Sequence, residues 1–520
     1  MDESISAPGG DFNLVPYESV PYEVSQPPRL AALAAMFGLS APDVTRCRVL
    51  ELGCAAGGNI IPLAMRFPHS QFVGIDLTDR HVRDGRARAK ALRLKNIRID
   101  QGDIAAVNPG RELYDYILCH GVYSWVPEPV REAILRLSAE HLSANGVAYV
   151  SYNVYPGWHM SSVTRDLILH HAGTGGEPER RIAKARWILG NIAKSLPGGT
   201  PYNDCLRLKA KELAARPDWY ILSDYLGTEN APCYFRDFAA KARAHGLIYL
   251  CESELNECFP ENLSAHVAAT VRLISRDNLI SLEQNMDFFK GRTFRQTLLV
   301  KAARETKIRR KLVPDKVRGL YVSGRLTSTH EADGSFKFTN AAGLNLTTRN
   351  PEVRDALRHL SDAFPSTRSV GELVAEAGAS TRKAILKLEP PLLDAVCKLI
   401  LAGAVNVSAV PLPPSQTISD KPKAWPPSRL DGLERRNWTT SRAHSYIALD
   451  DITVALLPFL DGSHDRRALQ ARLLQEVREG RVRLTDDASR RHLVGKELEA
   501  AAIEHVNLAL NKLAAAGVLE

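Results

Sequence analysis

The 520 residues are 45% hydrophobic and 24% charged, which is typical of a soluble globular chain with more than one domain. The 67 basic and 59 acidic residues leave a net charge of +8, too small for a dedicated nucleic-acid-binding protein. No stretch reaches the about 18 apolar residues of a membrane helix, and the first residues lack a signal-peptide pattern. The 8 cysteines form no Cys-x-x-Cys pair, so neither disulfides nor zinc are indicated. We expect a cytoplasmic protein without a membrane span.

Short apolar runs alternate with helical patterns over residues 46–160. This alternation predicts an α/β fold with a Rossmann-like sheet and helices on both faces. An apolar stripe over residues 30–37 predicts a helix within an N-terminal arm of residues 1–45. Asn59 and Thr78 are expected to cap the helices after the first two strands. The predicted strands are Arg48–Leu52, Phe72–Asp76, Ile97–Asp100, Tyr114–Cys119 and Val147–Tyr152.

A helical insert interrupts the second half of the predicted sheet. Residues 161–300 contain helical patterns broken by glycine-rich turns, and such inserts often build a lid, a substrate platform or an oligomer contact. The apolar runs Leu247–Cys251 and Thr297–Val300 predict the last two strands, with a helix over Phe235–His245 before them. We therefore expect the α/β domain to close near residue 300.

The C-terminal third differs in character from the rest of the chain. Helical patterns without strong strands predict a first helical domain over residues 301–410 and a winged-helix-like domain over residues 431–520. A Pro-rich linker at residues 411–430 separates them, and a weak repeat of leucines and glycines relates the two. Such modules suit contacts with protein or nucleic acid, and a role in packing alone is an equal alternative.

The positive charge is concentrated at one place. Residues 301–350 hold 11 basic and 4 acidic residues, a net charge of +7, whereas residues 1–160 hold 15 basic and 17 acidic residues, a net charge of −2. We interpret the basic segment 301–318 as a solvated connector between domains, and the alternative is a docking strip for an acidic partner surface.

Acidic residues lie at the ends of three successive predicted strands. Glu51–Asn59 is a glycine-rich turn that lets the backbone approach a ligand next to a helix N-terminus. Its acid and its G-x-x-x-G-G spacing differ from a dinucleotide fingerprint. Asp76 can accept from both hydroxyls of a ribose, and Asp103 can accept from an adenine amino group. Each acid alone could cap a helix or form a turn, but together they predict a pocket for S-adenosylmethionine.

The motifs at these strand ends resemble those of class I S-adenosylmethionine-dependent methyltransferases, which usually have a second glycine where Ala55 stands. A narrower set of motifs resembles bacterial methyltransferases with a methyltransferase regulatory domain, a group similar to rickettsial protein-lysine methyltransferases that act on outer-membrane proteins. The resemblance covers about residues 15 to 300, and it implies a middle domain used for dimerisation and hence a homodimer. Its motifs are Tyr17–Tyr22, Gly53–Asn59, Ser151–His159 and Phe294–Leu299.

We expect residues of the N-terminal arm and of the first four strand ends to bind the cofactor. They are Tyr17, Tyr22, Glu51, Gly53, Cys54, Ala55, Gly57, Asn59, Asp76, Leu77, Gly102, Asp103, Ile104 and His120. The two tyrosines of the arm are interpreted as a lid over the methionine end of the cofactor, with an ordinary surface arm as the alternative. No metal-ligand spacing occurs among the 15 histidines, so no metal is expected.

The loops after strands four and five are rich in aromatic residues, as a slot for an alkyl amine would be. An amine must react unprotonated, and burial among aromatic rings disfavours the ammonium form. We expect Tyr123, Tyr152, Asn153 and Tyr155 to line this pocket or orient the amine. Trp125, Trp158 and His159 are expected to contact the substrate, with loop packing as the alternative. The absence of an N/D-P-P-Y/F box argues against methylation of DNA base amino groups.

The leading hypothesis is a dimeric S-adenosylmethionine-dependent methyltransferase that modifies protein side-chain amines, with lysine as the first candidate. A second hypothesis is methylation of a small molecule or a peptide natural product, in which case the inserts form a closed lid. A third, from a different class, is a module that senses S-adenosylmethionine and binds protein or nucleic acid through its C-terminal domains.

Overall fold

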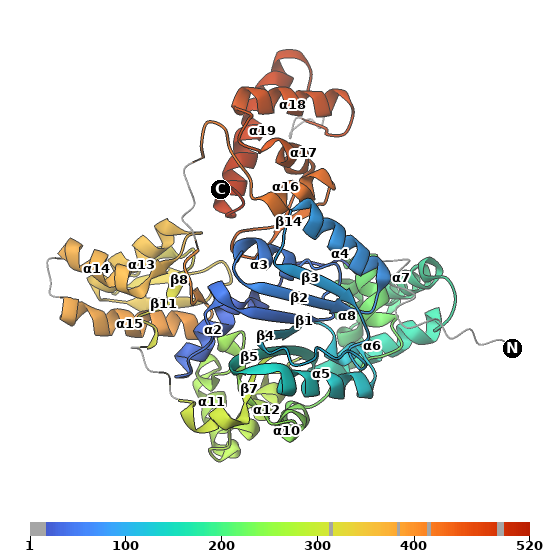
Figure 1. Ribbon diagram of the computed structural model, residues 1–520, viewed down its shortest axis with the longest axis vertical. Coiled ribbons are helices and arrows are strands. Elements are labelled where there is room, and N and C mark those ends of the chain that lie inside the picture. The colour runs from blue at the N-terminus through green and yellow to red at the C-terminus, as the bar shows by residue number, and fades with distance from the viewer. Residues whose placement is uncertain (1–16, 311, 313–315, 382–384, 413–417, 486–492) are drawn as a thin grey trace.

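The structure is a computed structural model that describes residues 17–310, 312, 316–381, 385–412, 418–485 and 493–520. The first 16 residues of the predicted arm, Lys311 of the basic segment and residues 413–417 of the Pro-rich linker lie outside this part. Figure 1 shows a central sheet with helices packed around it and two further modules built from the C-terminal third. The fold is α/β, as predicted.

A seven-stranded sheet forms the centre of the molecule, with strand order β3-β2-β1-β4-β5-β7-β6. β7 runs antiparallel to both β5 and β6, and the other neighbours are parallel. This is the predicted Rossmann-like sheet, and it places the carboxyl ends of β1, β2, β3 and β4 along one edge. The strands are β1 (Arg48–Leu52), β2 (Gln71–Asp76), β3 (Ile97–Gln101), β4 (Tyr114–Cys119), β5 (Leu142–Asn153), β6 (Leu247–Glu252) and β7 (Phe294–Lys301).

Helices cover both faces of the sheet, and each face has its own apolar cluster. One face is packed by α2 (Pro27–Met36), α3 (Ile60–Arg66) and α4 (Asp79–Ala91). The other face is packed by α5 (Glu128–His141) and α10 (Phe235–Ala244). Because side chains alternate along a strand, Tyr149 of β5 faces the first set of helices and Tyr152 faces the second.

The predicted insert is helical and has an apolar cluster of its own, built from residues between 168 and 226. Its helices are α6 (Gly157–Ala172), α7 (Pro178–Ser195), α8 (Pro201–Ala214) and α9 (Asp218–Tyr220), followed by the π-helical turn η4 (Ile221–Tyr225). Before β7 lie α11 (Ala265–Ser275) and α12 (Leu279–Lys290). Short 3-10 turns occur at η1 (Glu23–Ser25), η2 (Val44–Arg46), η3 (Tyr123–Trp125), η5 (Leu255–Glu257), η6 (Pro260–Asn262), η7 (Ala302–Lys307) and η9 (Leu457–Phe459).

The C-terminal third is mainly helical, as predicted, and also contains short antiparallel strands. The strands have two to four residues each, which is too short to show an alternating pattern in the sequence. They are β8 (Tyr321–Ser323), β9 (Thr327–His330), β10 (Phe336–Thr339), β11 (Asn345–Thr348), β12 (Arg368–Ser369), β13 (Asn406–Ser408), β14 (Trp438–Thr440) and β15 (Tyr446–Ala448). The helices are α13 (Pro351–Ala363), α14 (Val370–Thr381), α15 (Ile385–Leu401), α16 (Pro426–Leu433), α17 (Asp451–Leu456), α18 (Arg466–Arg478) and α19 (Gly495–Ala515).

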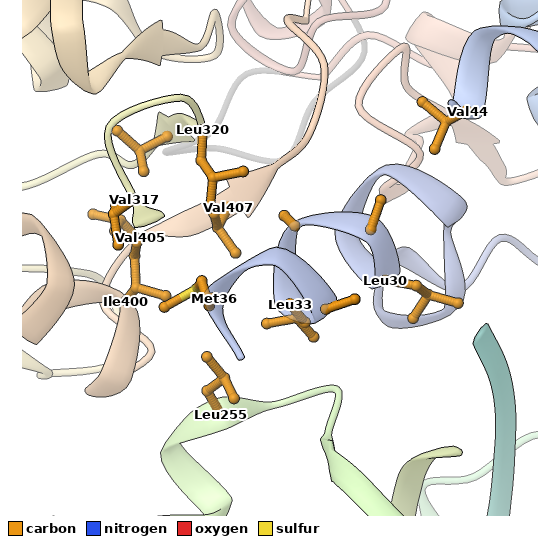
Figure 2. Close-up of a cluster of buried hydrophobic side chains, with 14 of the residues drawn as sticks. Leu30, Leu33, Met36, Val44, Leu255, Val317, Leu320, Ile400, Val405 and Val407 are labelled. Atoms are coloured by element: carbon orange, nitrogen blue, oxygen red, sulfur yellow. The ribbon is translucent and has the colours of Figure 1, made fainter. Parts of the chain in front are cut away.

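Helix α2 lies between the sheet and the first C-terminal module. Figure 2 shows Leu33 and Met36 of α2 close to Ile400 and Val407 of that module, and all four side chains are buried. The backbone N–H of Ala409 donates to the carbonyl of Pro28 at 2.9 Å, which joins β13 to the start of α2. Helix α2 is therefore part of one apolar core that joins the sheet domain to the first C-terminal module.

The basic segment 301–318 makes specific contacts with the sheet domain and with the first C-terminal module. Arg304 is buried and donates to the carbonyls of Asn145 at 2.9 Å and Ser40 at 2.6 Å. Arg310 donates to the carbonyl of Tyr249 at 2.7 Å, and Arg318 pairs with Glu389 at 2.7 Å. These three side chains fix the connector against the sheet domain and the first C-terminal module.

Three further findings concern the described residues as a whole. Among them, no helix is long and apolar enough to cross a membrane. In the same part of the chain, no group of three or more His, Cys, Asp or Glu side chains is placed to hold a metal ion. The eight cysteines are free. Six of the eight are buried, and these six are packing residues of the cores.

Candidate cofactor and acceptor site

The glycine-rich turn after β1 folds around the carboxylate of Asp76. The N–H of Ala55 donates to Asp76 Oδ2 at 2.8 Å, and the N–H of Thr78 donates to Oδ1 at 3.0 Å. His81 Nδ1 lies 3.3 Å from the same Oδ1. Ala55 has φ +46°, in the left-handed region that favours glycine, which explains the usual glycine at this position in the resembling sequences.

Asn59 and Thr78 occupy the predicted N-cap positions, but neither side chain makes a capping hydrogen bond. At α4, the N–H of Thr78 itself donates to the carboxylate of Asp76. At α3, Nδ2 of Asn59 donates to Glu51 Oε1 at 2.7 Å, and its Oδ1 accepts from the N–H of Tyr22 at 3.0 Å. Asn59 therefore links the end of β1 to the N-terminal arm.

Glu51 is a buried carboxylate with one oxygen left over. Its Oε1 accepts from Asn59, but its Oε2 has no hydrogen-bond partner among the residues that the structure describes. Burial raises the pKa of Glu51 to about 8. A buried carboxylate with a free oxygen at the end of a strand is suited to a cationic ligand, because the charge pair would offset the cost of burial.

The N-terminal arm crosses the opening of this pocket. A Cβ on Gly58 would lie 2.0 Å from the carbonyl oxygen of Ser19, so only glycine allows the arm to pass this close. Tyr17 and Tyr22 are joined through their hydroxyls at 3.0 Å. The ring of Tyr22 stacks on His120 with a centroid distance of 3.6 Å. The structure thus brings both predicted lid tyrosines to the end of β4.

His120 also contacts a tyrosine of β5. Its Nδ1 lies 2.8 Å from the hydroxyl of Tyr149, and burial lowers the pKa of His120 to about 3, so the imidazole is neutral. Burial, and then the charge of Asp224, raise the pKa of Tyr17 to about 12, so its phenol keeps its proton. Tyr22 therefore stacks on an uncharged imidazole ring.

The remaining predicted cofactor residues lie around the same edge of the sheet. Gly53 and Gly57 both have positive φ angles, +72° and +73°. The side chain of Cys54 packs toward Gly74 of β2, so only its backbone is available to a ligand. Gly102 donates its N–H to the Asp76 carbonyl at 2.9 Å. On the rim, Leu77 and Asp103 are exposed and Ile104 is buried.

Two of the predicted acceptor residues are packed in the apolar core on one face of the sheet. Tyr152 is buried and stacks on Phe238 of α10 with a centroid distance of 3.9 Å. Tyr123 is also buried and meets both rings edge to face. The alternation of β5 turns Tyr152 toward α5 and α10, away from the face that carries Tyr149.

The other predicted acceptor residues divide into two groups. Asn153 ends β5, is buried, and donates from Nδ2 to Asn230 Oδ1 of the insert at 3.3 Å. Tyr155 and His159 stack at 4.0 Å beside Tyr234 and do not join the tyrosines of the arm. Trp125 and Trp158 contact each other edge to face at 5.9 Å, which agrees with the packing alternative.

The insert adds two residues that the sequence analysis missed. Trp219 of α9 meets the ring of Tyr17 edge to face at 4.9 Å. Asp224 follows in the π-helical turn and accepts from Ser223 Oγ at 2.6 Å. Burial raises the pKa of Asp224 to about 6. No spacing rule marks these residues, although a π-helical turn is often found at functional sites.

A separate surface pocket of about 470 Å³ lies beside the loop 105–113 and the helix α5. None of the predicted site residues lines it. The predicted cofactor residues lie at the strand ends and not in this surface pocket.

Three family models match the chain. A methyltransferase domain matches residues 49–146, a predicted methyltransferase regulatory domain matches residues 217–301, and a PKMT C-terminal winged helix domain matches residues 420–518. The first match covers β1 to the middle of β5, and the last contains the β14–β15 hairpin and the helices α16 to α19.

Two relatives in sequence and one similar structure are from Rickettsia. Uncharacterized protein RP789 of Rickettsia prowazekii is 32% identical over 505 residues, which cover 94% of this chain and 90% of that protein. Uncharacterized protein RP028 of the same organism is 33% identical over 233 residues, which cover 45% of this chain and 93% of that protein. The structure of PKMT2 from Rickettsia typhi in complex with AdoHcy is 25% identical, with a TM-score of 0.86, and the match covers 97% of this chain and 100% of that one.

The Rossmann-like sheet, the carboxylates Glu51 and Asp76 at its strand ends and these matches define an S-adenosylmethionine-dependent methyltransferase. The chain belongs to the family that joins a methyltransferase domain to a methyltransferase regulatory domain and a PKMT winged helix domain, together with RP789. Its cofactor is S-adenosylmethionine, and the buried carboxylate of Glu51 with its free oxygen fits the cationic methionine end of that molecule.

Proposed function

We propose that the chain transfers the methyl group of S-adenosylmethionine to a side-chain amine of a protein, with lysine as the acceptor. The observation that carries this proposal is the carboxylate of Asp224, whose charge acts on the hydroxyl of Tyr17, a residue whose ring meets that of Trp219 edge to face. A carboxylate among aromatic rings attracts a cationic alkyl amine through both its charge and the faces of the rings. The name PKMT2 of the similar rickettsial structure supports the same acceptor class.

The predicted cofactor residues keep their roles within this proposal. The glycines Gly53 and Gly57 let the backbone approach the cofactor, and Glu51 binds its ammonium group. Asp76 binds the ribose, and the rim residues Leu77, Gly102, Asp103 and Ile104 surround the adenine. Tyr17, Tyr22 and His120 cover the methionine end. When bound, the cofactor supplies an electrophilic methyl group on a sulfonium sulfur.

The acceptor side must bind an ammonium ion and then let it lose a proton. The ionised carboxylate of Asp224 attracts the ammonium and can accept its proton, because burial raises the pKa of Asp224 to about 6. The ring contact between Tyr17 of the arm and Trp219 of the insert reduces the access of water to this side. Asn153 remains a candidate for orienting the amine, since its amide lies beside the insert.

A comparison of free and blocked amines tests the acceptor class. Extract proteins are incubated with the chain and labelled S-adenosylmethionine, either untreated or after acetylation of their lysines. We expect label in the untreated proteins and a loss of nearly all of it after acetylation, because an acetylated amine is not nucleophilic. Equal labelling of both samples would contradict the proposal.

Replacing Asp224 with asparagine is expected to lower kcat/KM for a lysine peptide by at least about tenfold, the lower range for a lost acid–base group. In the wild type, activity should rise with pH through about 6 as the carboxyl group ionises. The variant should lack this rise. Steady-state rates between pH 5 and 8 measure both effects. Asp218→Asn is the matched control, since that exposed acid of the same insert pairs with Arg186, and an equal loss there would argue against a specific role.

Cofactor binding is expected to release a proton from Glu51. The pKa of about 8 means that the ligand-free carboxyl is mostly protonated at pH 7, and a cationic ligand favours its ionised form. The affinity should therefore rise with pH up to about 8, with close to one proton released at pH 7. Calorimetry in buffers of different ionisation enthalpy measures this release, and Glu51→Gln should remove it. Identical proton release in both proteins would exclude this role.

The C-terminal domain gives no support to the nucleic-acid-binding alternative. The hairpin β14–β15, which would be its projecting element, is packed inward: Trp438, Thr439 and His444 are buried. The proposed homodimer has support from exposed apolar side chains in the region before β7, since Leu273 of α11 is 78% exposed and Phe288 of α12 is 50% exposed.

A further inference from the structure

The tip of the β14–β15 hairpin lies against the cofactor pocket, although it is almost 400 residues away in sequence. Figure 1 shows β14 and α16 beside α3 and α4 of the sheet domain. At the hairpin tip, His444 has φ +68° and is 1% exposed. Its Nε2 lies 2.8 Å from Oδ1 of Asn59, the residue that holds Glu51. The winged helix domain therefore makes a direct hydrogen bond into the pocket.

The direction of this hydrogen bond follows from its partners. Oδ1 of Asn59 can only accept, and it already accepts from the N–H of Tyr22 at 3.0 Å. The proton must therefore lie on Nε2 of His444. Burial lowers the pKa of His444 to about 3, so the ring is neutral and has a single N–H. Its Nδ1 has no hydrogen-bond partner among the described residues, which leaves Asn59 as the target of that N–H.

This contact fixes which end of the Asn59 amide faces Glu51. With Oδ1 held by His444 and Tyr22, Nδ2 points to Glu51 Oε1 at 2.7 Å and to Ser25 Oγ at 3.1 Å. A flipped amide would turn its oxygen toward Glu51, and it could no longer accept the hydrogen bonds from Tyr22 and His444. The hairpin tip and the arm thus stabilise the same amide orientation, the one in which Nδ2 positions the side chain of Glu51.

The same region of the arm is held by both C-terminal modules. The carboxylate of Glu23, next to Tyr22, accepts from Ser445 Oγ of the hairpin at 2.9 Å and from Asn406 Nδ2 of the first module at 2.7 Å. Trp438 of β14 donates to the carboxylate of Glu18. The arm that crosses the cofactor pocket is therefore anchored on its outer side by residues of the C-terminal third.

We propose that His444 is a positioning residue for the cofactor site, through which the winged helix domain fixes Asn59, and with it the carboxylate of Glu51 and the arm at Tyr22. The pocket is then complete only when this domain is docked. The inference rests on the proposed role of Glu51 in cofactor binding and is independent of the acceptor.

Cofactor affinity of the full-length chain tests this proposal without any methyl acceptor. We expect His444→Ala to weaken the binding of S-adenosylhomocysteine about tenfold, the cost of one buried hydrogen bond and the freed amide. His444→Gln can place an amide N–H in the same position and should bind within about threefold of the wild type. Isothermal titration calorimetry measures the affinities, and thermal unfolding shows that each variant is folded.

Two further variants test whether the effect of His444 on cofactor affinity passes through Asn59 or arises from the docking of the winged helix domain in general. In an Asn59→Ala background, His444→Ala should weaken binding no further, because its effect passes through that amide. Arg88→Ala removes an ion pair between α4 and Asp431 at 2.6 Å and leaves Asn59 untouched, so it should bind the cofactor as the wild type does. A full additional loss in the first case, or an equal loss in the second, would overturn the proposal.

The outcomes distinguish this proposal from the one on which it rests. If Glu51→Gln binds the cofactor as tightly as the wild type, the proposed role of Glu51 is wrong, and fixing Asn59 through His444 cannot affect cofactor binding by way of Glu51. If Glu51→Gln binds weakly but His444→Ala binds normally, Glu51 keeps its role and His444 is a packing residue only. Should His444→Ala unfold, the folded glutamine variant and Asn59→Ala still decide, because normal binding by Asn59→Ala would contradict a relay.

Discussion

Asp76→Ala is expected to raise the dissociation constant of S-adenosylhomocysteine by at least about 100-fold, from the loss of several hydrogen bonds of about 1 kcal/mol each. The carboxylate accepts from the N–H groups of Ala55 and Thr78 in the free protein, so it shapes the glycine-rich turn as well as the proposed ribose contact. Without it, Ala55 loses the partner that holds its left-handed conformation. Calorimetric titration measures the effect.

The matched control for this prediction is Asp79→Ala, three residues further along. Asp79 lies in the first turn of α4 and pairs with Arg83 at 3.0 Å on the exposed side of the helix. Its loss should leave cofactor affinity unchanged within about twofold, since an exposed ion pair contributes little. If Asp76→Ala bound within about threefold of the wild type, the pocket would have to lie elsewhere.

Arg295→Met is expected to lower the free energy of unfolding by about 3–5 kcal/mol, the usual cost of removing one partner from a buried ion cluster. Arg295 of β7 is fully buried and its guanidinium reaches Glu252 at 2.6 Å, Asp287 at 2.9 Å and Glu283 at 3.1 Å. It also lies over the ring of Phe235 at 3.9 Å. In the variant, Arg292 would still pair with Asp287 at 3.1 Å and with Glu283 at 3.9 Å, but Glu252 would lose its ion pair with Arg295.

Urea denaturation followed by circular dichroism measures this loss. Arg236→Met is the control, because Arg236 is exposed and lies 3.5 Å from Asp237 at the surface, so its removal should change stability by less than about 0.5 kcal/mol. Equal midpoints for Arg295→Met and the wild type would show that the cluster does not stabilise the sheet. The cluster also gives a physical reason for the arginine in the Phe294–Leu299 motif.

The features predicted correctly from sequence depend on neighbouring residues. The strands β1 to β4 and the glycine-rich turn have local patterns, so their positions agree within one residue or are identical. The acids at the strand ends were placed together because the carboxyl ends of parallel strands share an edge. Tyr17 and Tyr22 reach that edge because the arm passes over Gly58, which has no side chain to block it.

The features that were missed depend on contacts between distant segments. Tyr149 and Tyr152 look alike in the sequence, and only the packing of α10 against one face shows that Tyr152 is a core residue. Asp224 reaches the arm through the fold of the insert, and His444 reaches Asn59 through the docking of a whole domain. No local periodicity contains such information, so a single sequence could not supply these contacts.

The acceptor is tested most directly by tandem mass spectrometry of proteins incubated with the full-length chain and S-adenosylmethionine carrying a deuterated methyl group. We expect labelled methyl groups on the Nζ atoms of lysines, and none when Asp76→Ala replaces the wild type. Label found only on carboxylates, hydroxyls or small molecules, with no labelled lysine, would contradict this expectation.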